Sequence, residues 1–142
     1  MAHSAAAGTS AHQLQCVVVT PEATVLETTA EFVALPLYDG EIGIAPQHSP
    51  LIGRLGYGEM RITTAGKTAA YYVDGGFVQV VDNVVSVLTN RAVPAEQLDA
   101  QSASEQIKSA LHRPANTPEL LAIRDRLISQ SRAQIRVARR AK

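Results

Sequence analysis

The sequence is poor in the features that mark several large classes of protein. It contains one cysteine and no tryptophan in 142 residues, and a single cysteine excludes both an internal disulfide framework and a multi-cysteine metal site. Its longest apolar runs, such as residues 16–19, are far shorter than the roughly 20 residues that a membrane-spanning helix needs. The first dozen residues lack the cationic start and the apolar core of a secretory signal. We therefore expect residues 1–12 to form a flexible tail and the rest to fold as one domain, or as a domain with an appendage.

Neither sign of charge is in excess over the whole chain, which has 13 basic and 13 acidic residues, but the two signs are unevenly distributed. Residues 1–112 hold 5 basic and 11 acidic residues, a formal charge of −6. Residues 113–142 hold 8 basic and 2 acidic residues, a formal charge of +6. All six aromatic residues lie before position 78. This shift in composition predicts two architectures joined in one chain.

Residues 13–90 carry the pattern of β-structure. Runs of four to seven apolar and β-branched residues recur, and turn-forming pairs such as Asp39-Gly40 or Asp82-Asn83 end them. Eight or more short strands need their apolar faces covered by a second layer, so the pattern predicts an antiparallel β-sandwich or a flattened barrel. The expected strands include residues 14–19, 23–27, 31–37, 42–44, 60–63, 68–73, 77–81 and 84–89.

Residues 91–142 change to a helical pattern. Apolar residues at near-helical spacing between Leu98 and Leu111 predict a first helix. Pro114 ends it, because the residue before a proline is pushed out of the helical region. Thr117 is placed to cap a second helix that runs towards Arg140. The fold class predicted for the whole chain is therefore β + α, an N-terminal antiparallel β-sandwich followed by a C-terminal two-helix antiparallel hairpin.

The predicted hairpin has too few large aliphatic side chains to be stable by itself. The burial of these side chains contributes less than the ordering of the two helices costs. The hairpin therefore needs an external surface, either the sandwich or another subunit. If these two surfaces differ by only a few kcal/mol, the hairpin has two positions; the alternative is a hairpin fixed permanently on its own sandwich.

No pattern in the sequence predicts an active site, a metal site or a cofactor. Asp39 and Glu41 flank a glycine in an expected turn, which explains them better than acid–base catalysis does. The four histidines, at positions 3, 12, 48 and 112, lack the spacing of metal ligands. Cys16 lies in an apolar strand pattern, where a buried and inert thiol is expected. The glycines of 53–58 and 74–76 lack the context of a phosphate-binding loop and are interpreted as turn backbone.

The basic second helix is the most distinctive remaining feature. A cationic segment of this kind attracts nucleic acid, anionic lipid or an acidic protein surface. No aromatic residue is interleaved to stack on bases, and the acidic first part of the chain repels phosphate, so an acidic protein partner is preferred. The basic residues are Arg124, Arg126, Arg132, Arg136, Arg139, Arg140 and Lys142.

Residues 39–51, DGEIGIAPQHSPL, resemble a block in the ε subunit of F-type ATP synthases. That block has the order glycine-acid-leucine-glycine-isoleucine, then proline-glycine-histidine and proline-leucine. Here Ile42 takes the place of leucine and Gln47 that of glycine. The resemblance covers the chain from Leu14 to its end, and the family's fold is also a β-sandwich followed by a helical hairpin. Further segments in the family's order are 18–22, 58–62, 75–77 and 84–89.

The resemblance implies a central-stalk, or rotor, subunit that transmits rotation and catalyses nothing itself. In that family the sandwich binds the γ subunit and rests on the membrane-embedded ring of c subunits, whose proton-driven rotation leads to ATP synthesis in the catalytic head. The expected location is the cytoplasmic face of the bacterial inner membrane, peripheral to it through the complex. By position, Glu41 and His48 are candidates for contacts with the c-ring and γ; the alternative is that they are simply exposed turn residues.

The family's hairpin can also extend along γ into the catalytic head, where it restrains ATP hydrolysis. Basic residues of its second helix meet an acidic region of the β subunits there, next to the α subunits. The resemblance makes Arg126, Arg132 and Arg136 the candidates for this contact, in which opposite charges would attract.

Some members of the family bind ATP through a motif at the start of the first helix. Leu98, Asp99 and Ala103 match this motif, but Ser102 stands where the motif has an arginine. A hydroxyl cannot replace a cationic partner of phosphate. We therefore expect weak or absent ATP binding and no cofactor. A micromolar affinity for ATP in a titration would contradict this expectation.

A competing hypothesis is a free-standing β-sandwich binding module whose basic helix recognises an acidic ligand or nucleic acid. A stable complex with γ in gel filtration would favour the rotor subunit. A shift of oligonucleotides with a steep salt dependence would favour the module. A third hypothesis, a small hydrolase, lacks a candidate nucleophile.

Overall fold

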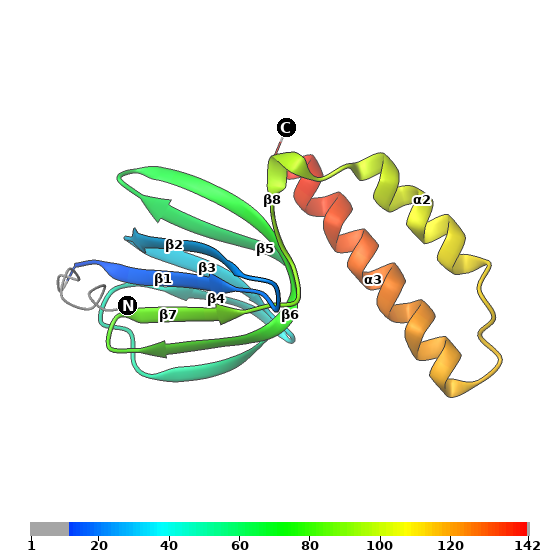
Figure 1. Ribbon diagram of the computed structural model, residues 1–142, viewed down its shortest axis with the longest axis horizontal. Helices are drawn as coiled ribbons and strands as arrows, with labels where there is room; N and C mark the ends of the chain where they lie inside the picture. Colours follow the sequence, from blue (N-terminus) through cyan, green and yellow to red (C-terminus); the bar gives the residue numbers. More distant parts are fainter. Residues whose placement is uncertain (1–11, 142) are drawn as a thin grey trace.

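Eight strands form one sheet that folds over on itself, and a helical hairpin follows (Figure 1). The computed structural model describes residues 12–141, so the tail predicted for residues 1–12 lies, except for its last residue, outside the described residues. Neighbouring strands follow the order β2-β1-β7-β6-β5-β3-β4, and β8 pairs with β6 off this path. The strands are β1 (Leu14–Val19), β2 (Thr24–Ala30), β3 (Phe32–Leu37), β4 (Gly40–Ile44), β5 (Leu51–Thr64), β6 (Lys67–Val81), β7 (Val84–Leu88) and β8 (Ala92–Pro94).

One pair of neighbouring strands is parallel. β1 runs parallel to β7, with Gln15 opposite Val84 and Val19 opposite Leu88, so the prediction of a wholly antiparallel sandwich is wrong at this pair. All other pairs are antiparallel. The two parallel strands are separated by five intervening strands in the sequence, and no local pattern of residues reveals a pairing over that distance. The predicted class, a β-sandwich followed by two helices, is confirmed.

Strand alternation builds a single core inside the sandwich. In β6, for example, Val78 and Val80 are fully buried, whereas Phe77 and Gln79 between and beside them are exposed, as the period of two in a strand requires. Each of β1 to β7 contributes to the core. Its buried side chains are Leu14, Cys16, Val18, Ala30, Val33, Leu35, Ile44, Leu55, Met60, Ile62, Val73, Val78, Val80, Val85 and Val87.

Two glycine-containing segments that the sequence suggested as turns lie inside long strands. Residues 53–58 belong to β5 and residues 74–76 to β6, so the turn interpretation is wrong for both. Gly75 and Gly76 have positive φ angles of 73° and 108°, which bend β6 without ending it. At Gly56, an added Cβ would lie 2.7 Å from the carbonyl oxygen of Leu37. These glycines allow strands to bend and to approach one another closely.

The turns predicted at shorter signals are confirmed. Ala65 and Gly66 have φ angles of 53° and 77°, and Asp82 and Asn83 have φ angles of 50° and 64°. Two consecutive positive φ angles are the geometry of the tight two-residue hairpin turn. These two turns connect β5 to β6 and β6 to β7.

The predicted helical hairpin is also confirmed. Asp99 begins the first helix, where its side chain accepts a hydrogen bond from the backbone N–H of Gln101 at 3.0 Å. Thr117 begins the second helix and accepts from the backbone N–H of Leu120 at 3.2 Å, the role predicted for it. The helical elements are η1 (Ala95–Gln97), α2 (Ala100–Leu111) and α3 (Pro118–Arg140).

A short strand that the sequence did not suggest connects the two parts. β8 pairs with Tyr71 to Val73 of β6, so the sheet continues as far as Pro94. The division of the chain into a sandwich of residues 13–90 and a hairpin of residues 91–142 stays a prediction. The position of β8 makes this division open to a direct test by truncation.

The hairpin lies beyond one end of the sandwich. Figure 1 shows α3 nearer to the strands than α2, with the C-terminal end of α3 beside β8 and its N-terminal end pointing away. The sandwich residues that form one buried cluster with α3 come from β6 and η1, and further α3 contacts fall on β5. We call this the helix end of the sandwich and name the opposite end, where the β4–β5 and β6–β7 connections lie, the loop end.

Candidate functional site: two docking surfaces

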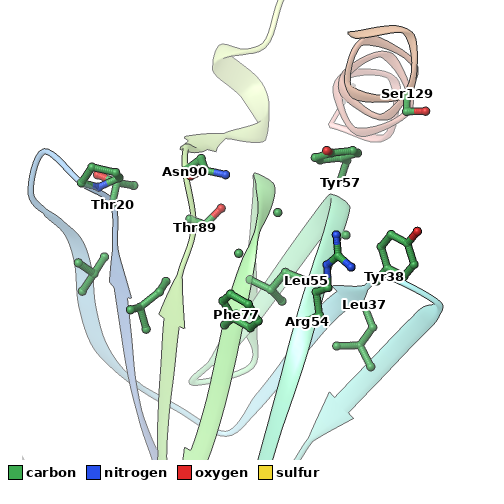
Figure 2. Close-up of a pocket in the computed structure, with 16 residues that line it drawn as sticks. Thr20, Leu37, Tyr38, Arg54, Leu55, Tyr57, Phe77, Thr89, Asn90 and Ser129 are labelled. Carbon is green, nitrogen blue, oxygen red and sulfur yellow. The ribbon is translucent and has the colours of Figure 1, made fainter. Parts of the chain in front are cut away.

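An open groove crosses the helix end of the sandwich, beneath α3 (Figure 2). Its volume is about 1140 Å³. The ends of β1, β3 and β7 and the bent middles of β5 and β6 line it, and Ser129 borders it from α3. The bend at Gly75 and Gly76 and the close approach at Gly56 place these strand ends side by side, so the groove follows from the glycines that the sequence suggested as turns.

Large apolar side chains are exposed in and beside this groove. Tyr38 is 69%, Phe77 58% and Leu88 53% exposed, and Ile52 on β5 is 75% exposed. Phe77 lies opposite Leu88 across the β6–β7 ladder. Arg54 and Ile52 are two residues apart on β5, so both side chains point to the outer face that Phe77 also occupies. Apolar side chains gathered on one face indicate a surface that another macromolecule covers.

Arg54 adds a cation to this apolar surface. It lies opposite Phe77 in the β5–β6 ladder, and its guanidinium carbon is 4.3 Å from the centre of the Tyr38 ring. At this distance the positive charge of the arginine is attracted to the face of the tyrosine ring. We call Tyr38, Ile52, Arg54, Phe77 and Leu88 the outer-face patch.

A second feature is the seam between α3 and the sandwich. Tyr72 of β6 is fully buried there, and its hydroxyl donates a hydrogen bond to Oδ1 of Asp74 at 3.0 Å. Burial and the negative charge of Asp74 raise the pKa of the Tyr72 hydroxyl above its ordinary value. Asp74 also accepts from Nε2 of Gln130 on α3 at 3.0 Å. The remaining buried side chains of the seam are apolar and, apart from Leu98, small: Ala95, Leu98, Ala133, Val137 and Ala138.

An ion pair between Arg140 and Glu59 joins the last turn of α3 to the sandwich. Nη1 of Arg140 lies 3.1 Å from Oε1 of Glu59 on β5, and Nη1 of Arg61 lies 2.9 Å from the same oxygen. Arg61 also reaches Glu41 at 3.5 Å, and its hydrogen bond to Glu59 raises its pKa. The side chain of Glu59 is only 10% exposed, so its charge is neutralised from two sides in a confined position.

The two residues suggested for contacts with the c-ring and γ lie far apart. Glu41 is at the start of β4, at the helix end, where it shares a small cleft with Glu59 and Arg136. His48 follows the other end of β4, in the β4–β5 connection at the loop end, and its Nδ1 lies 2.8 Å from the Ser49 carbonyl oxygen. β4 is an edge strand of the sheet. Glu41 and His48 can therefore contact the same partner only if that partner lies along the β4 edge.

The three arginines suggested for contact with the β subunits are all exposed, and within residues 12–141 none of them makes an ion pair. Arg132 and Arg136 are four residues apart and lie on one side of α3. Arg126 lies about 120° around the helix from Arg132, since each residue turns an α-helix by about 100°. The structure therefore groups only two of the three candidates.

The residues that match the ATP motif have packing and capping roles in this structure. Leu98 and Ala103 are 8% and 2% exposed, and Leu98 belongs to the seam cluster. The Asp99 carboxylate caps α2. Ser102 is exposed on α2, and no cationic side chain replaces the motif's arginine at this position.

Cys16 lies as predicted in the middle of a strand, fully buried, and burial raises the pKa of its thiol to about 12. A thiol with so high a pKa is a poor nucleophile. Among the described residues, no group of three or more His, Cys, Asp or Glu side chains is placed to hold a metal ion. No helix in this part of the chain is long and apolar enough to cross a membrane.

Several residues of these surfaces were missed from the sequence. Glu59 and Arg61 are two apart on a strand, a spacing that places them on one face, so their pairing had a local signal. No local signal linked Asp74 to Gln130 or Glu59 to Arg140, because these partners are 56 and 81 residues apart in the sequence. The apolar outer-face patch could not be told from core side chains without knowing which face of each strand is covered.

The fold and these surfaces define a class of protein: a docking subunit with a β-sandwich that carries an apolar patch and a basic helical hairpin. Residues 13–95 match the family model for the ATP synthase delta/epsilon chain β-sandwich domain. The ATP synthase epsilon chain of Rhodopirellula baltica is 48% identical over 126 residues, which are 89% of this chain and 98% of that protein. That of Desulfitobacterium hafniense is 48% identical over 86 residues, 61% of this chain and 65% of that protein.

Solved structures show the same fold. A chain of the Euglena gracilis mitochondrial ATP synthase, in a structure of OSCP, F1 and the c-ring, superposes with a TM-score of 0.79 at 20% identity, over 89% of this chain and 81% of that chain. A chain of the Tetrahymena thermophila mitochondrial ATP synthase central stalk and c-ring superposes with a TM-score of 0.70 at 13% identity, over 88% and 96%.

The chain therefore belongs to the ATP synthase epsilon chain family. It is a non-catalytic, central-stalk subunit of a membrane-associated ATP synthase, and it takes part in ATP synthesis and proton transport through that complex. This membership favours the rotor subunit over the free-standing binding module that the basic helix also suggested.

Proposed function

We propose that the sandwich binds the γ subunit through the outer-face patch, and that it transmits rotation from the c-ring to the catalytic head through this contact. The observation that carries the proposal is the exposure of Tyr38, Phe77 and Leu88 around the groove, with Ile52 exposed on the same outer face of β5. Exposed aromatic and aliphatic side chains around a groove are typical of the centre of a stable protein interface. A subunit that transmits torque needs such an interface with the shaft.

The test is binding of the purified chain to purified γ. Replacing both Phe77 and Leu88 with serine should weaken the complex at least ten-fold, because large apolar side chains in the centre of an interface contribute most of its affinity. Val25 on β2 is also exposed, at 42%, but it does not line the groove, so Val25→Ser is the matched control. If the double variant co-elutes with γ as tightly as the original chain, the outer-face patch is not the γ interface.

We further propose that the c-ring lies along the β4 edge, which would let it meet both Glu41 and His48. Cysteines placed at these two positions should react with a water-soluble thiol reagent in the isolated chain and be shielded together in the assembled complex. Native Cys16 is buried and does not interfere. Shielding at only one position would show that the ring covers one end of the sandwich rather than the edge.

The proposed role of the hairpin is to restrain ATP hydrolysis by contact with the catalytic head. The end of the hairpin away from the sandwich carries apolar side chains that are exposed among the described residues: Leu111 is 56%, Leu120 36%, Leu121 40% and Ile123 36% exposed. Arg132 and Arg136 supply positive charge on one side of α3. Removing both charges should raise ATP hydrolysis by the assembled complex and leave assembly with γ unchanged.

The proposed location is the cytoplasmic face of the bacterial inner membrane, held there through the complex. Two of the relatives named above are bacterial proteins, and the proposed γ and c-ring contacts place the subunit on the side of the membrane that carries the catalytic head. Fractionation of the native membrane with antibodies to the subunit tests this location.

A further inference from the structure

The way α3 is held on the sandwich has an unusual feature at Glu59. One carboxylate oxygen of Glu59 receives two guanidinium groups, Arg61 at 2.9 Å and Arg140 at 3.1 Å. Arg61 belongs to the same strand as Glu59, whereas Arg140 comes from the last turn of α3, 81 residues away. One of the two cations therefore stays with Glu59 wherever the hairpin goes, and the other leaves with α3.

This duplication changes the cost of separating α3 from the sandwich. When a confined ion pair loses one partner, the charge left behind normally destabilises the protein strongly. Here the departure of Arg140 leaves Glu59 paired with Arg61, so no confined carboxylate is left without a cation. The two guanidinium groups also repel one another while both are bound to one oxygen, so Arg61 weakens the hold of Arg140 in the docked position.

The rest of the seam is suited to separation as well. The α3 residues buried in it are Ala133, Val137 and Ala138, which present little apolar area. Within residues 12–141, the other polar attachments of α3 to the sandwich are a hydrogen bond from Gln130 to Asp74 and a side-chain hydrogen bond between Gln134 and Tyr72. Asp74 keeps a bond from Tyr72 of its own strand when α3 leaves. Glu59, Asp74 and Tyr72 thus each keep a partner within the sandwich when α3 leaves.

We propose that Glu59 and Arg61 form a reversible latch for the hairpin, in which Arg61 stays bound to Glu59 and keeps its charge paired whenever Arg140 leaves with α3. The latch sets how easily an acidic partner can capture α3, because Arg140, and Arg136 in the same cleft, face the chain's own carboxylates Glu41 and Glu59 in the docked position. The partner has to compete with these carboxylates. Only this last consequence depends on the proposed restraint of hydrolysis; the latch is a property of the isolated chain.

The latch predicts opposite effects for two arginines that bind the same oxygen. Arg140→Gln should lower the ratio of docked to undocked hairpin by roughly two- to five-fold, the range expected for a largely exposed ion pair. Arg61→Gln should raise this ratio at least two-fold, since it removes the repulsion and leaves Arg140 as the sole cation on Glu59. The matched control is Arg139→Gln, which removes the same charge from the same exposed turn of α3 and should leave the ratio unchanged.

The ratio can be measured in the full-length chain by the distance between two nitroxide labels. Glu27→Cys on β2 and Gln101→Cys on α2 are exposed positions on the two parts, and Cys16 is fully buried. Circular dichroism would establish that each variant is folded. In a Glu59→Gln background the opposition between the two arginines should disappear, which keeps the test valid if Arg61→Gln alone lowers the stability of the sandwich.

The latch is wrong if Arg61→Gln and Arg140→Gln shift the ratio in the same direction, or if Arg139→Gln shifts it as far as Arg140→Gln does. A separate measurement addresses the function. If the label distances behave as expected but Arg140→Gln leaves ATP hydrolysis by the assembled complex unchanged, the latch stands and the proposed restraint of hydrolysis by the hairpin fails.

Discussion

Truncation on either side of β8 tests where the sandwich ends. We compare a chain that stops at Asn90 with one that stops at Ala95; both lack the hairpin, and they differ only in whether β8 is present. β8 pairs with residues 71–73 of β6 over three positions. The chain that ends at Asn90 is therefore expected to fold, but with lower stability than the chain that ends at Ala95.

The size of the difference follows from the contacts of β8. Backbone hydrogen bonds contribute about 1 kcal/mol each to stability, so a ladder of three residue pairs amounts to roughly 2 kcal/mol. Ala92 packs on the main core and Val93 on the seam cluster, both partly buried, and partial burial of such side chains adds on the order of 1 kcal/mol. We expect the shorter chain to be less stable by about 2–4 kcal/mol.

Urea unfolding followed by far-ultraviolet circular dichroism measures this difference. For domains of this size the unfolding free energy falls by about 1–3 kcal/mol per molar urea, so the two midpoints should be separated by roughly 1–3 M. Equal midpoints would refute the reasoning, because they would show that β8 contributes nothing and that the sandwich ends at residue 90 as the sequence suggested. Aggregation of both chains would show instead that the hairpin is needed for folding.

Three further predictions concern stability. Gly76→Ala should lower the unfolding free energy by more than about 3 kcal/mol, because the added Cβ would collide with the carbonyl of Leu88 and the φ angle is 108°. The control is Gly40→Ala, where an added Cβ has nothing within 4 Å and the unfolding free energy should change by less than about 1 kcal/mol. Equal effects of the two substitutions in urea unfolding would contradict the structure. The pKa of the Cys16 thiol is raised from 9.0 to about 12, so the stability that the protonated thiol contributes is complete well below pH 9 and is lost as the pH rises towards 12. Between pH 8 and 10 the unfolding free energy of the chain should fall by on the order of 1 kcal/mol more than that of Cys16→Ala. Parallel pH profiles would show that the thiol is not confined. Thr117→Ala should cost about 1 kcal/mol and speed hydrogen exchange in the first turn of α3, and unchanged exchange there would exclude a capping role.

The sequence by itself determined the type of most elements and many of their ends, although it missed β8 and the continuity of the long strands β5 and β6. Alternating side chains, turn residues such as Asp82-Asn83, the cap at Thr117 and the helix end before Pro114 each depend only on residues close by in the sequence. These signals are local, because they depend on backbone geometry and on which side of one element is apolar. The sum of charges also located the basic helix without any knowledge of the fold.

Tertiary structure alone decided how these elements meet. The parallel pairing of β1 with β7, the bend in β6 at Gly75 and Gly76, and the pairing of β8 all depend on partners that are distant in the sequence. The same is true of the functional surfaces: Phe77 is exposed because no other part of residues 12–141 covers its face of the sheet, and Glu59 meets Arg140 because α3 folds back on β5. A local pattern indicates whether a side chain is apolar or charged, but the packing of the whole chain decides which residue that side chain contacts.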